Sequence, residues 1–136
     1  MITKKKKIRI IDFGFAVRVA DASPDKLYRL RPAGNARWRA PEMTQRLPYS
    51  SNVDVYSFGI ILNELLSKER PFSAVIKSRD VAQLAVAGER PPMSFIGLDN
   101  LRSLIAEAWH QNAALRPSFA VLLKRLTEIF EQLMNT

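Results

Sequence analysis

Hydrophobic and polar positions first form a pattern at residues 8–13, which read Ile-Arg-Ile-Ile-Asp-Phe. The positions alternate and then fuse into a short β-branched run, and Gly14 follows directly, so the pattern predicts a strand that ends at Gly14. One carboxylate, Asp12, interrupts this apolar run. A buried carboxylate is costly unless a partner or an ion meets it. The sequence therefore predicts a partner for Asp12.

The next stretch, residues 20–40, shows no sustained periodicity. It contains two prolines, one glycine and many charged residues, which predicts a long exposed segment. Loops of this length within a folded domain are usually functional or disordered. Pro41 and Glu42 then suit the first turn of a short helix, which we expect to end before Pro48.

Residues 51–68 carry apolar side chains around most of a helix circumference. Ser51 is a suitable N-cap, and Asp54 follows three residues later in an arrangement that resembles a capping box. Little of such a helix can face water, so we expect it in the middle of the domain. Gly59 at its centre costs about 1 kcal/mol relative to alanine, which predicts that another backbone passes close by. The apolar positions are Val53, Val55, Tyr56, Phe58, Ile60, Ile61, Leu62, Leu65 and Leu66.

Further helices are predicted toward the C-terminus. A weaker helix over residues 78–87 ends at Gly88 and a pair of prolines. Residues 99–111 place apolar side chains at helical spacing, namely Leu101, Leu104, Ile105, Ala108 and Trp109. Ser118 then caps a final helix whose apolar stripe is Phe119, Leu122, Leu126, Ile129, Phe130 and Leu133. The whole pattern predicts one strand, a long loop and about five helices.

Composition narrows the possible chemistry. A chain of 136 residues with 47% apolar content can form a single domain with a core. It contains no cysteine, so it has no disulfide, thiolate nucleophile or zinc–thiolate site, and His110 alone cannot form a histidine metal cluster. The metal sites that remain possible are those with oxygen ligands. The chain lacks both an apolar run of about 18 residues and a signal peptide, so we expect a soluble, cytoplasmic protein without a membrane span.

The net charge of +8 favours an anionic partner. Residues 4–7 are four consecutive lysines, which we expect to form a solvated turn between strands, and a second basic block covers residues 26–46. No aromatic residue interleaves with the lysines, so a surface for stacking bases is poorly supported. Nucleic acid is therefore not the favoured partner.

Four short motifs occur in a characteristic order: Asp-Phe-Gly at 12–14, Ala-Pro-Glu at 40–42, Asp-Val-Tyr-Ser-Phe-Gly at 54–59 and Arg-Pro-Ser-Phe at 116–119. In this order they resemble the C-terminal lobe of a eukaryotic protein kinase, and the chain is most similar to the tyrosine-kinase-like branch of Ser/Thr kinases. The resemblance runs from residue 8 to residue 133. It implies a mainly α, incomplete kinase fold, in which residues 1–136 form a single partial kinase domain with a short strand or hairpin at its N-terminus.

Within that domain, the resemblance implies an activation segment over about residues 12–42 and a helical body over about residues 51–134. Asp12 would coordinate the Mg²⁺ that bridges the phosphates of ATP, and Phe13 and Gly14 would complete this cofactor site. Glu42 and Arg116 would form a buried ion pair that anchors the far end of the activation segment.

Several further residues receive roles from the same resemblance. Asp54 would accept hydrogen bonds from the catalytic-loop backbone in a full kinase, although stabilising its helix dipole explains it equally well. Ser23 and Tyr28 are possible regulatory phosphorylation sites, the alternative being ordinary loop polarity. Substrate contacts fall on Asn35, Arg37, Trp38 and Arg39. We expect Arg39 to favour an acidic residue just after the target hydroxyl, and Asn63 and Ala108 to be packing variants.

The 136 residues contain no Gly-rich phosphate loop and no His-Arg-Asp catalytic loop. The resemblance therefore places the catalytic aspartate upstream of Met1, and we expect the isolated chain to have no turnover. In full-length form it implies ATP-dependent phosphorylation of Ser/Thr or Tyr hydroxyls in protein substrates, with an N-terminal lobe or a partner protein completing the site. A non-catalytic interaction module is the alternative, binding through the basic activation segment or residues 78–92, and a basic nucleic-acid binder is a remote one.

Overall fold

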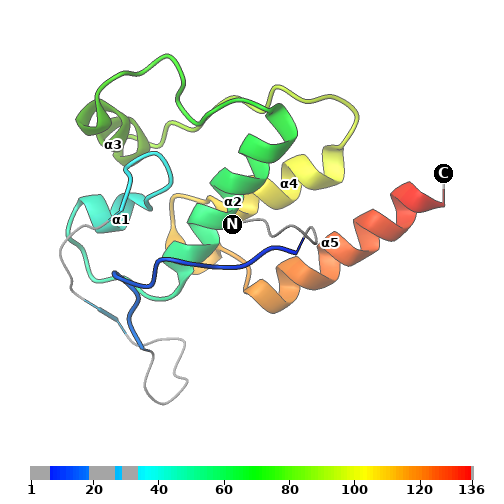
Figure 1. The fold of residues 1–136 in the computed structure, drawn as a ribbon, viewed down its shortest axis with the longest axis horizontal. Coiled ribbons are helices and arrows are strands. Elements are labelled where there is room, and N and C mark those ends of the chain that lie inside the picture. The colour runs from blue at the N-terminus through cyan, green and yellow to red at the C-terminus, as the bar shows by residue number, and fades with distance from the viewer. Residues whose placement is uncertain (1–6, 19–26, 29–33, 136) are drawn as a thin grey trace.

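The computed structural model describes residues 7–18, 27–28 and 34–135. As predicted, this part of the chain is mainly helical (Figure 1). Tyr28 and Tyr49 form an isolated antiparallel bridge. The helical elements in chain order are α1 (Pro41–Thr44), α2 (Asn52–Ser67), α3 (Ser78–Val86), α4 (Asp99–Ala108), the 3-10 turn η2 (Ala113–Leu115) and α5 (Phe119–Met134).

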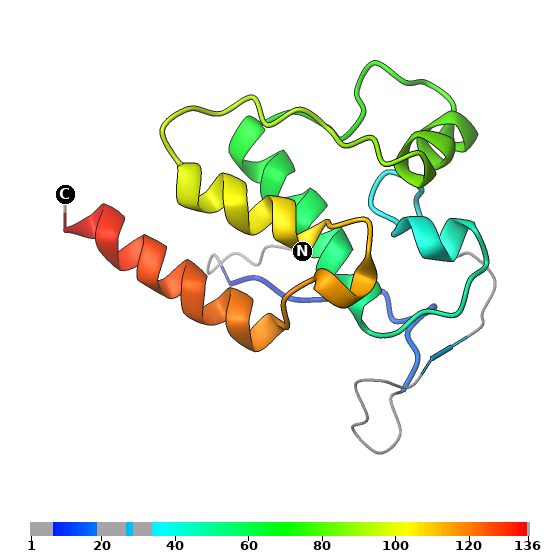
Figure 2. The same ribbon diagram turned by 180° about the vertical axis from the view of Figure 1, so that it is seen from behind.

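Helix α2 lies at the centre of the helical body. It packs along α4, and α4 packs on α5, whereas α1 and α3 contact each other at the opposite end (Figures 1 and 2). Tyr56 and Ile60 of α2 belong to one buried cluster with Ile105 of α4. Val55 belongs to a second cluster, which includes Leu122 of α5. Because α2 contributes to both clusters, the elements that surround it are positioned through this one helix.

The predicted close approach at Gly59 is confirmed. A Cβ atom built on Gly59 would lie 3.0 Å from Cβ of Ala108 and 3.2 Å from the backbone nitrogen of Trp109. Contacts this short leave little room for a side chain. The missing side chain of Gly59 thus lets the end of α4 lie directly against α2.

The predicted inner face of the 99–111 helix is also confirmed, although α4 ends at Ala108. Its apolar positions Leu101, Leu104, Ile105 and Ala108 are buried, as is the adjacent Trp109. Ser118 caps α5 as expected, because its side-chain oxygen accepts a hydrogen bond from the backbone nitrogen of Val121 at 3.3 Å.

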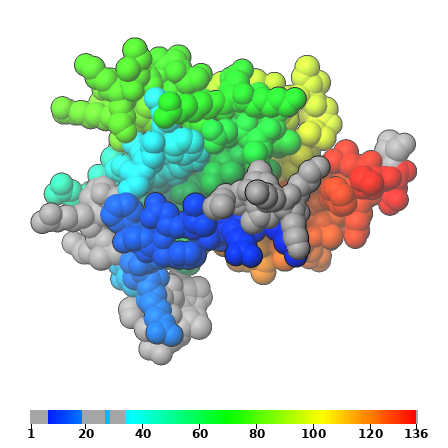
Figure 3. Space-filling view, viewed as in Figure 1, coloured from blue at the N-terminus to red at the C-terminus, as the bar shows by residue number. Residues whose placement is uncertain are grey.

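The predicted strand over residues 8–13 is formed only at its first residue, because Ile8 makes a single β-bridge. Residues 9–13 have no regular secondary structure, and Asp12 takes a left-handed backbone conformation with φ of 65°. Ile8 and Ile10 are each 82% exposed. A strand requires a neighbouring backbone and a covering layer, and the described residues supply no strand beside 9–13. Residues 7–18 lie instead on the surface of the body (Figure 3).

The capping box expected at the start of α2 is also wrong. Ser51 has helical dihedral angles of −58° and −14°, and its side chain makes no capping hydrogen bond. An N-cap side chain needs extended backbone angles to reach the free N–H groups of the first turn. The hydroxyl of Ser50 accepts from the backbone nitrogen of Asn52 at 3.3 Å instead.

Two helices expose more apolar surface than their sequences predict. Ile61 and Leu65 of α2 are exposed, although we expected this helix to be covered all round. The stripe of α5 is buried only at Leu122, and its C-terminal half projects from the body (Figure 1). Leu126 and Ile129 of this stripe pack partly against the second cluster, whereas Phe130 and Leu133 are exposed. Within the described part of the chain, no helix is both long and apolar enough to cross a membrane.

Candidate functional site

The predicted ion pair between Glu42 and Arg116 is formed. Pro41 opens α1, where a missing N–H costs nothing, and so places Glu42 in the first turn. Arg116 donates from Nη1 to Oε1 of Glu42 at 2.6 Å and from Nη2 to Oε2 at 2.9 Å. This bidentate contact joins residues 74 positions apart, and the Arg116 side chain is fully buried.

Arg116 also holds the backbone around the pair. Its Nη1 donates to the carbonyl of Asn52 at 3.0 Å, and its Nε donates to the carbonyl of His110 at 2.9 Å. One side chain therefore connects α1, the start of α2 and the segment that precedes α5. Such a planar fork with several matched acceptors is a geometry that lysine cannot supply.

Arg37 was predicted to contact substrate, and the structure corrects this role. Its side chain turns into the body and is 7% exposed. The guanidinium donates to the carbonyls of Pro71, Phe72 and Val75 at 2.8, 2.7 and 2.5 Å. These three acceptors use the fork that a substrate would otherwise contact. Arg37 thus fastens residues 34–40 to the loop between α2 and α3.

Trp38 is anchored to the body by its side chain and by its backbone. Its indole Nε1 donates to Oε2 of Glu64 at 2.9 Å, and its carbonyl accepts from the hydroxyl of Ser57 at 2.7 Å. The ring packs against the core cluster that contains Tyr56. Contacts to α2 therefore position Trp38 and leave it half-buried.

Asn35 and Arg39 stay closer to the surface. Asn35 is exposed, and its side-chain oxygen accepts from the backbone nitrogen of Arg37 at 3.1 Å. Arg39 donates from Nη2 to the carbonyl of Gly34 at 2.7 Å. Its buried Nε has no hydrogen-bond partner among the described residues, and burial lowers the pKa of its guanidinium. Of the four predicted substrate contacts, Asn35 is the most exposed, whereas Trp38 and Arg39 are half-buried and Arg37 is buried.

Asp12, Phe13 and Gly14 lie in the exposed N-terminal segment. Phe13 is 68% exposed, so its ring is not part of the core. Its carbonyl accepts from the backbone nitrogen of Ala16 at 3.0 Å in a turn. Among the described residues, no three His, Cys, Asp or Glu side chains come close enough to hold a metal ion. Asp12 therefore offers one oxygen ligand and not a complete magnesium site.

The remaining predicted residues are dispersed. Asp54 lies exposed in the first turn of α2, where it suits the helix dipole, and desolvation raises the pKa of its carboxyl. Ser23 lies outside the described residues. Tyr28 is half-buried and exchanges two backbone hydrogen bonds with Tyr49, of 2.7 and 3.0 Å.

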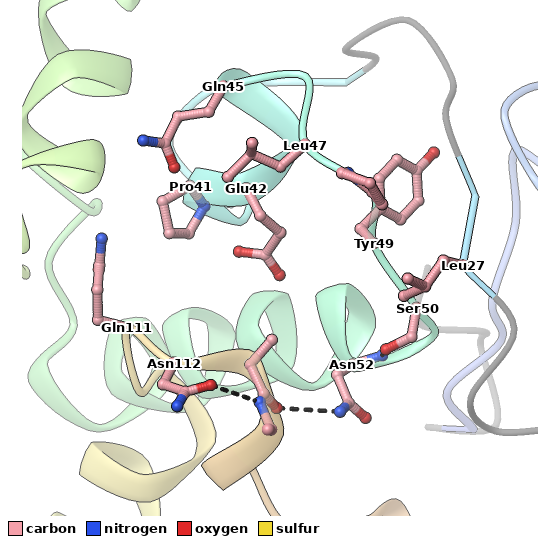
Figure 4. A pocket seen from close by; sticks show the side chains of 13 residues that line it. Leu27, Pro41, Glu42, Gln45, Leu47, Tyr49, Ser50, Asn52, Gln111 and Asn112 are labelled. Atoms are coloured by element: carbon pink, nitrogen blue, oxygen red, sulfur yellow. Dashed lines mark hydrogen bonds between the residues drawn. The ribbon is translucent and has the colours of Figure 1, made fainter.

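A cavity of about 650 Å³ opens beside the ion pair. Figure 4 shows Glu42 pointing into the space between α1 and the start of α2. Gln111 and Asn112 lie on a neighbouring wall of the cavity. The backbone carbonyl of Ala113 accepts a hydrogen bond from the side chain of Asn52, and the backbone nitrogen of Ala114 donates one to the side-chain oxygen of Asn112. The cavity wall is therefore built from the same segments that Arg116 ties together.

Sequence reasoning missed two residues beside the pair, Arg90 and Gln111. Arg90 lies next to the aromatic ring of Tyr56, and its Nη2 donates to Oε1 of Gln111 at 2.7 Å. The only local signal was the position of Arg90 between Gly88 and a proline pair, which marks a loop and no particular contact.

Comparison with known proteins identifies the family. Residues 1–126 match the family described as protein tyrosine and serine/threonine kinase. This match covers most of the chain, so the chain belongs to that family of protein kinases. The resemblance inferred from the four motifs is thereby confirmed.

The chain is similar to several protein kinases. It is 40% identical over 126 residues to the dual specificity protein kinase shkD of Dictyostelium discoideum, covering 90% of this chain and 16% of that protein. It is 34% identical to the dual specificity protein kinase pyk3 of the same organism, over 93% of this chain and 9% of that protein. It is 31% identical to the serine/threonine/tyrosine-protein kinase HT1 of Arabidopsis thaliana, over 96% of this chain and 33% of that protein. The chain thus spans a minor part of each relative.

Proposed function

We propose that this chain forms the part of a protein kinase that anchors the activation segment and presents it to a protein substrate. The reaction is transfer of the γ-phosphoryl group of ATP to a serine or threonine hydroxyl, or to a tyrosine hydroxyl. The bidentate contact between Arg116 and Glu42 is the main support, because it holds the end of that segment against the helical body. Two relatives are named dual specificity kinases, which supports both kinds of hydroxyl.

In this proposal the chain contributes one carboxylate, Asp12, to binding of Mg²⁺ with ATP. Phe13 and Gly14 would adjoin the same site. The exposed position of Asp12 supports this role, since its carboxylate is accessible to an ion. Mg²⁺ is usually held by only one or two protein carboxylates together with phosphates and water. The other protein ligands would come from residues outside the described ones.

We also propose that Arg39 selects an acidic residue just after the target hydroxyl. Its guanidinium uses Nη2 on the carbonyl of Gly34, which leaves other donors for a carboxylate. Asn35 lies at the same surface and would contact the substrate backbone. In a peptide array with the active kinase, Arg39→Met should remove the preference for an acidic residue at that position. A wild-type profile without an acidic preference would refute this role of Arg39.

A hybrid enzyme tests the proposed function. In it, the residues of shkD that align with residues 8–133 are replaced by those of this chain, and phosphate transfer to a protein substrate is measured. We expect activity in the hybrid and no detectable transfer after Asp12→Asn. Asp80→Asn is the matched control, because Asp80 is an exposed carboxylate on α3. A hybrid whose activity survives Asp12→Asn would overturn the proposed role of Asp12.

A non-catalytic interaction module is the second candidate. The exposed side chains of Ile8, Ile10, Phe13 and Phe15 favour it, because an apolar surface of this kind usually binds another protein or lobe. The hybrid enzyme separates the two candidates. A hybrid that unfolds cooperatively with the thermal stability of shkD, but transfers no phosphate, would favour the non-catalytic candidate.

A further inference from the structure

Two guanidinium groups lie over the ring of Tyr56 in α2. The Cζ atom of Arg90 is 5.0 Å from the ring centroid, and that of Arg116 is 5.1 Å away. Tyr56 is 1% exposed, so these cation–π contacts are largely shielded from water. Tyr56 therefore connects Arg116 of the ion pair to a second cation from a different part of the chain.

Arg90 also ties together two segments by hydrogen bonds. Its Nε donates to the carbonyl of Trp109 at 3.0 Å, and its Nη2 donates to Oε1 of Gln111 at 2.7 Å. Its Nη1 reaches the carbonyl of Ala85 near the end of α3 at 3.3 Å. The amide of Gln111 returns a hydrogen bond to the carbonyl of Val86 at 3.0 Å. We call Arg90 and Gln111 together the clasp.

The clasp and the ion pair hold neighbouring peptide groups. Arg90 binds the carbonyl of Trp109, and Arg116 binds the carbonyl of His110, the next residue. Because adjacent peptide planes share a Cα atom, a shift of one carbonyl moves the other. A shift of the His110 carbonyl therefore moves the guanidinium of Arg116, which pairs with Glu42.

We propose that Arg90 is a positioning residue for the Glu42–Arg116 ion pair, acting through the ring of Tyr56 and the peptides of residues 109–111. It also links that pair to the end of α3. The proposal concerns contacts within this chain, and its test needs neither nucleotide nor catalytic activity. Electrostatics support it, because the charges of Arg116 and Glu42 both act on the pKa of Arg90, which burial lowers.

The test measures hydrogen exchange of the Arg116 Nε–H by ¹⁵N NMR in the full 136-residue chain. Its rate is divided by that of the backbone amide of Ile60, which reports opening of the core. We expect Arg90→Lys to raise this ratio about tenfold, because lysine cannot form the fork that binds four acceptors at once. An increase of both rates in parallel would mean only a general loss of stability, and would overturn the proposal.

Arg102→Lys is the matched control. Arg102 also lies over an aromatic ring, with Cζ 4.6 Å from the centroid of Phe95, and donates to the carbonyl of Met93 at 3.0 Å. It makes no contact with the ion pair among the described hydrogen bonds, so the ratio should stay unchanged. An equal effect of Arg90→Lys and Arg102→Lys would contradict the proposal.

Milder variants keep the test decisive if Arg90→Lys does not fold. Gln111→Ala removes one arm of the clasp and should raise the exchange ratio in the same direction. Tyr56→Phe retains the aromatic ring and should leave the ratio near the wild-type value, whereas Tyr56→Leu should raise it. If Gln111→Ala leaves the ratio unchanged and Tyr56→Phe acts like Tyr56→Leu, the proposed path through the clasp and the ring is wrong.

Discussion

Arg116 donates four hydrogen bonds, two to the carboxylate of Glu42 and two to the carbonyls of Asn52 and His110. Its side chain is fully buried, while that of Glu42 is 12% exposed. A buried charge is tolerated only when it is paired and hydrogen-bonded. The carboxylate of Glu42 is therefore the group on which the burial of Arg116 depends.

Glu42→Gln should lower the free energy of unfolding by about 3–5 kcal/mol, because it leaves a buried guanidinium without its counter-charge. Urea denaturation of the chain measures this loss. Glu107→Gln is the matched control, since Glu107 also forms a bidentate contact, with Arg125, but at a partly exposed site. Exposed pairs contribute about 0–1 kcal/mol. Equal losses for the two variants would contradict the importance of burial.

Asp54 allows a prediction about pH. Desolvation raises the pKa of this carboxyl in the folded state, so its ionisation disfavours folding. The free energy of unfolding is then reduced as the pH rises through the raised pKa, and this penalty is absent below the ordinary pKa. Asp54→Asn should therefore stabilise the chain at about pH 7, and the gain should disappear near about pH 3.

The measurement for Asp54 is urea denaturation of wild type and variant at both pH values. Asp80→Asn is the control, because Asp80 lies at the corresponding position in the first turn of α3. Both substitutions remove a negative charge from the positive end of a helix dipole. If Asp80→Asn shows the same gain with the same pH dependence, desolvation is not the cause.

For individual residues, the sequence indicated which charged side chains matter better than it indicated which groups they contact. The pairing of Glu42 with Arg116 followed from the family motifs, since no local pattern connects residues 74 positions apart. The burial of Arg37 was missed because its three acceptors are backbone carbonyls of a loop more than 30 residues later. Backbone carbonyls carry no residue identity, so a sequence gives no signal for such contacts.

Among the secondary-structure elements, the start of a helix offers a direct comparison of two serines. Ser118 precedes α5 with extended backbone angles and accepts a hydrogen bond from Val121, whereas Ser51 precedes α2 with helical angles and caps nothing. Ser118→Ala should therefore lower the free energy of unfolding by about 1 kcal/mol, and Ser51→Ala by far less. Thermal or urea unfolding measures both variants. A larger loss for Ser51→Ala would contradict the observed caps.

The helices were predictable and the strand was not, for a physical reason. A helix forms its hydrogen bonds within its own segment, so apolar spacing such as that of residues 99–108 is sufficient to predict its buried face. A strand over residues 8–13 depends on a second strand that its own sequence does not specify. The exposure of Ile61 and Leu65 on α2 was missed for a similar reason, because periodicity shows which residues are apolar and not which element covers them.

For the whole molecule, three side chains fix residues 37–42 to the helical body. Arg37 binds the loop before α3, Trp38 binds α2 through Glu64, and Glu42 binds Arg116. By contrast, the segment with Asp12 lies on the surface and contains exposed apolar side chains. Residues 37–42 are thus well anchored, whereas the described residues form no complete nucleotide site.

This asymmetry predicts how the isolated chain behaves with nucleotide. Phosphoryl transfer depends on several groups that position and neutralise the phosphates together, and removing groups that act as a unit reduces the rate far more than additively. The 136 residues contain no Gly-rich phosphate loop and no His-Arg-Asp motif. We expect the purified chain to transfer no detectable label from γ-³²P-ATP with Mg²⁺ to a protein substrate. Asp12→Asn is the control for a contaminating kinase, because activity that survives it does not come from this chain. Label transfer that Asp12→Asn abolishes would show that the 136 residues already suffice for catalysis, and that a Gly-rich loop and a His-Arg-Asp motif are not required.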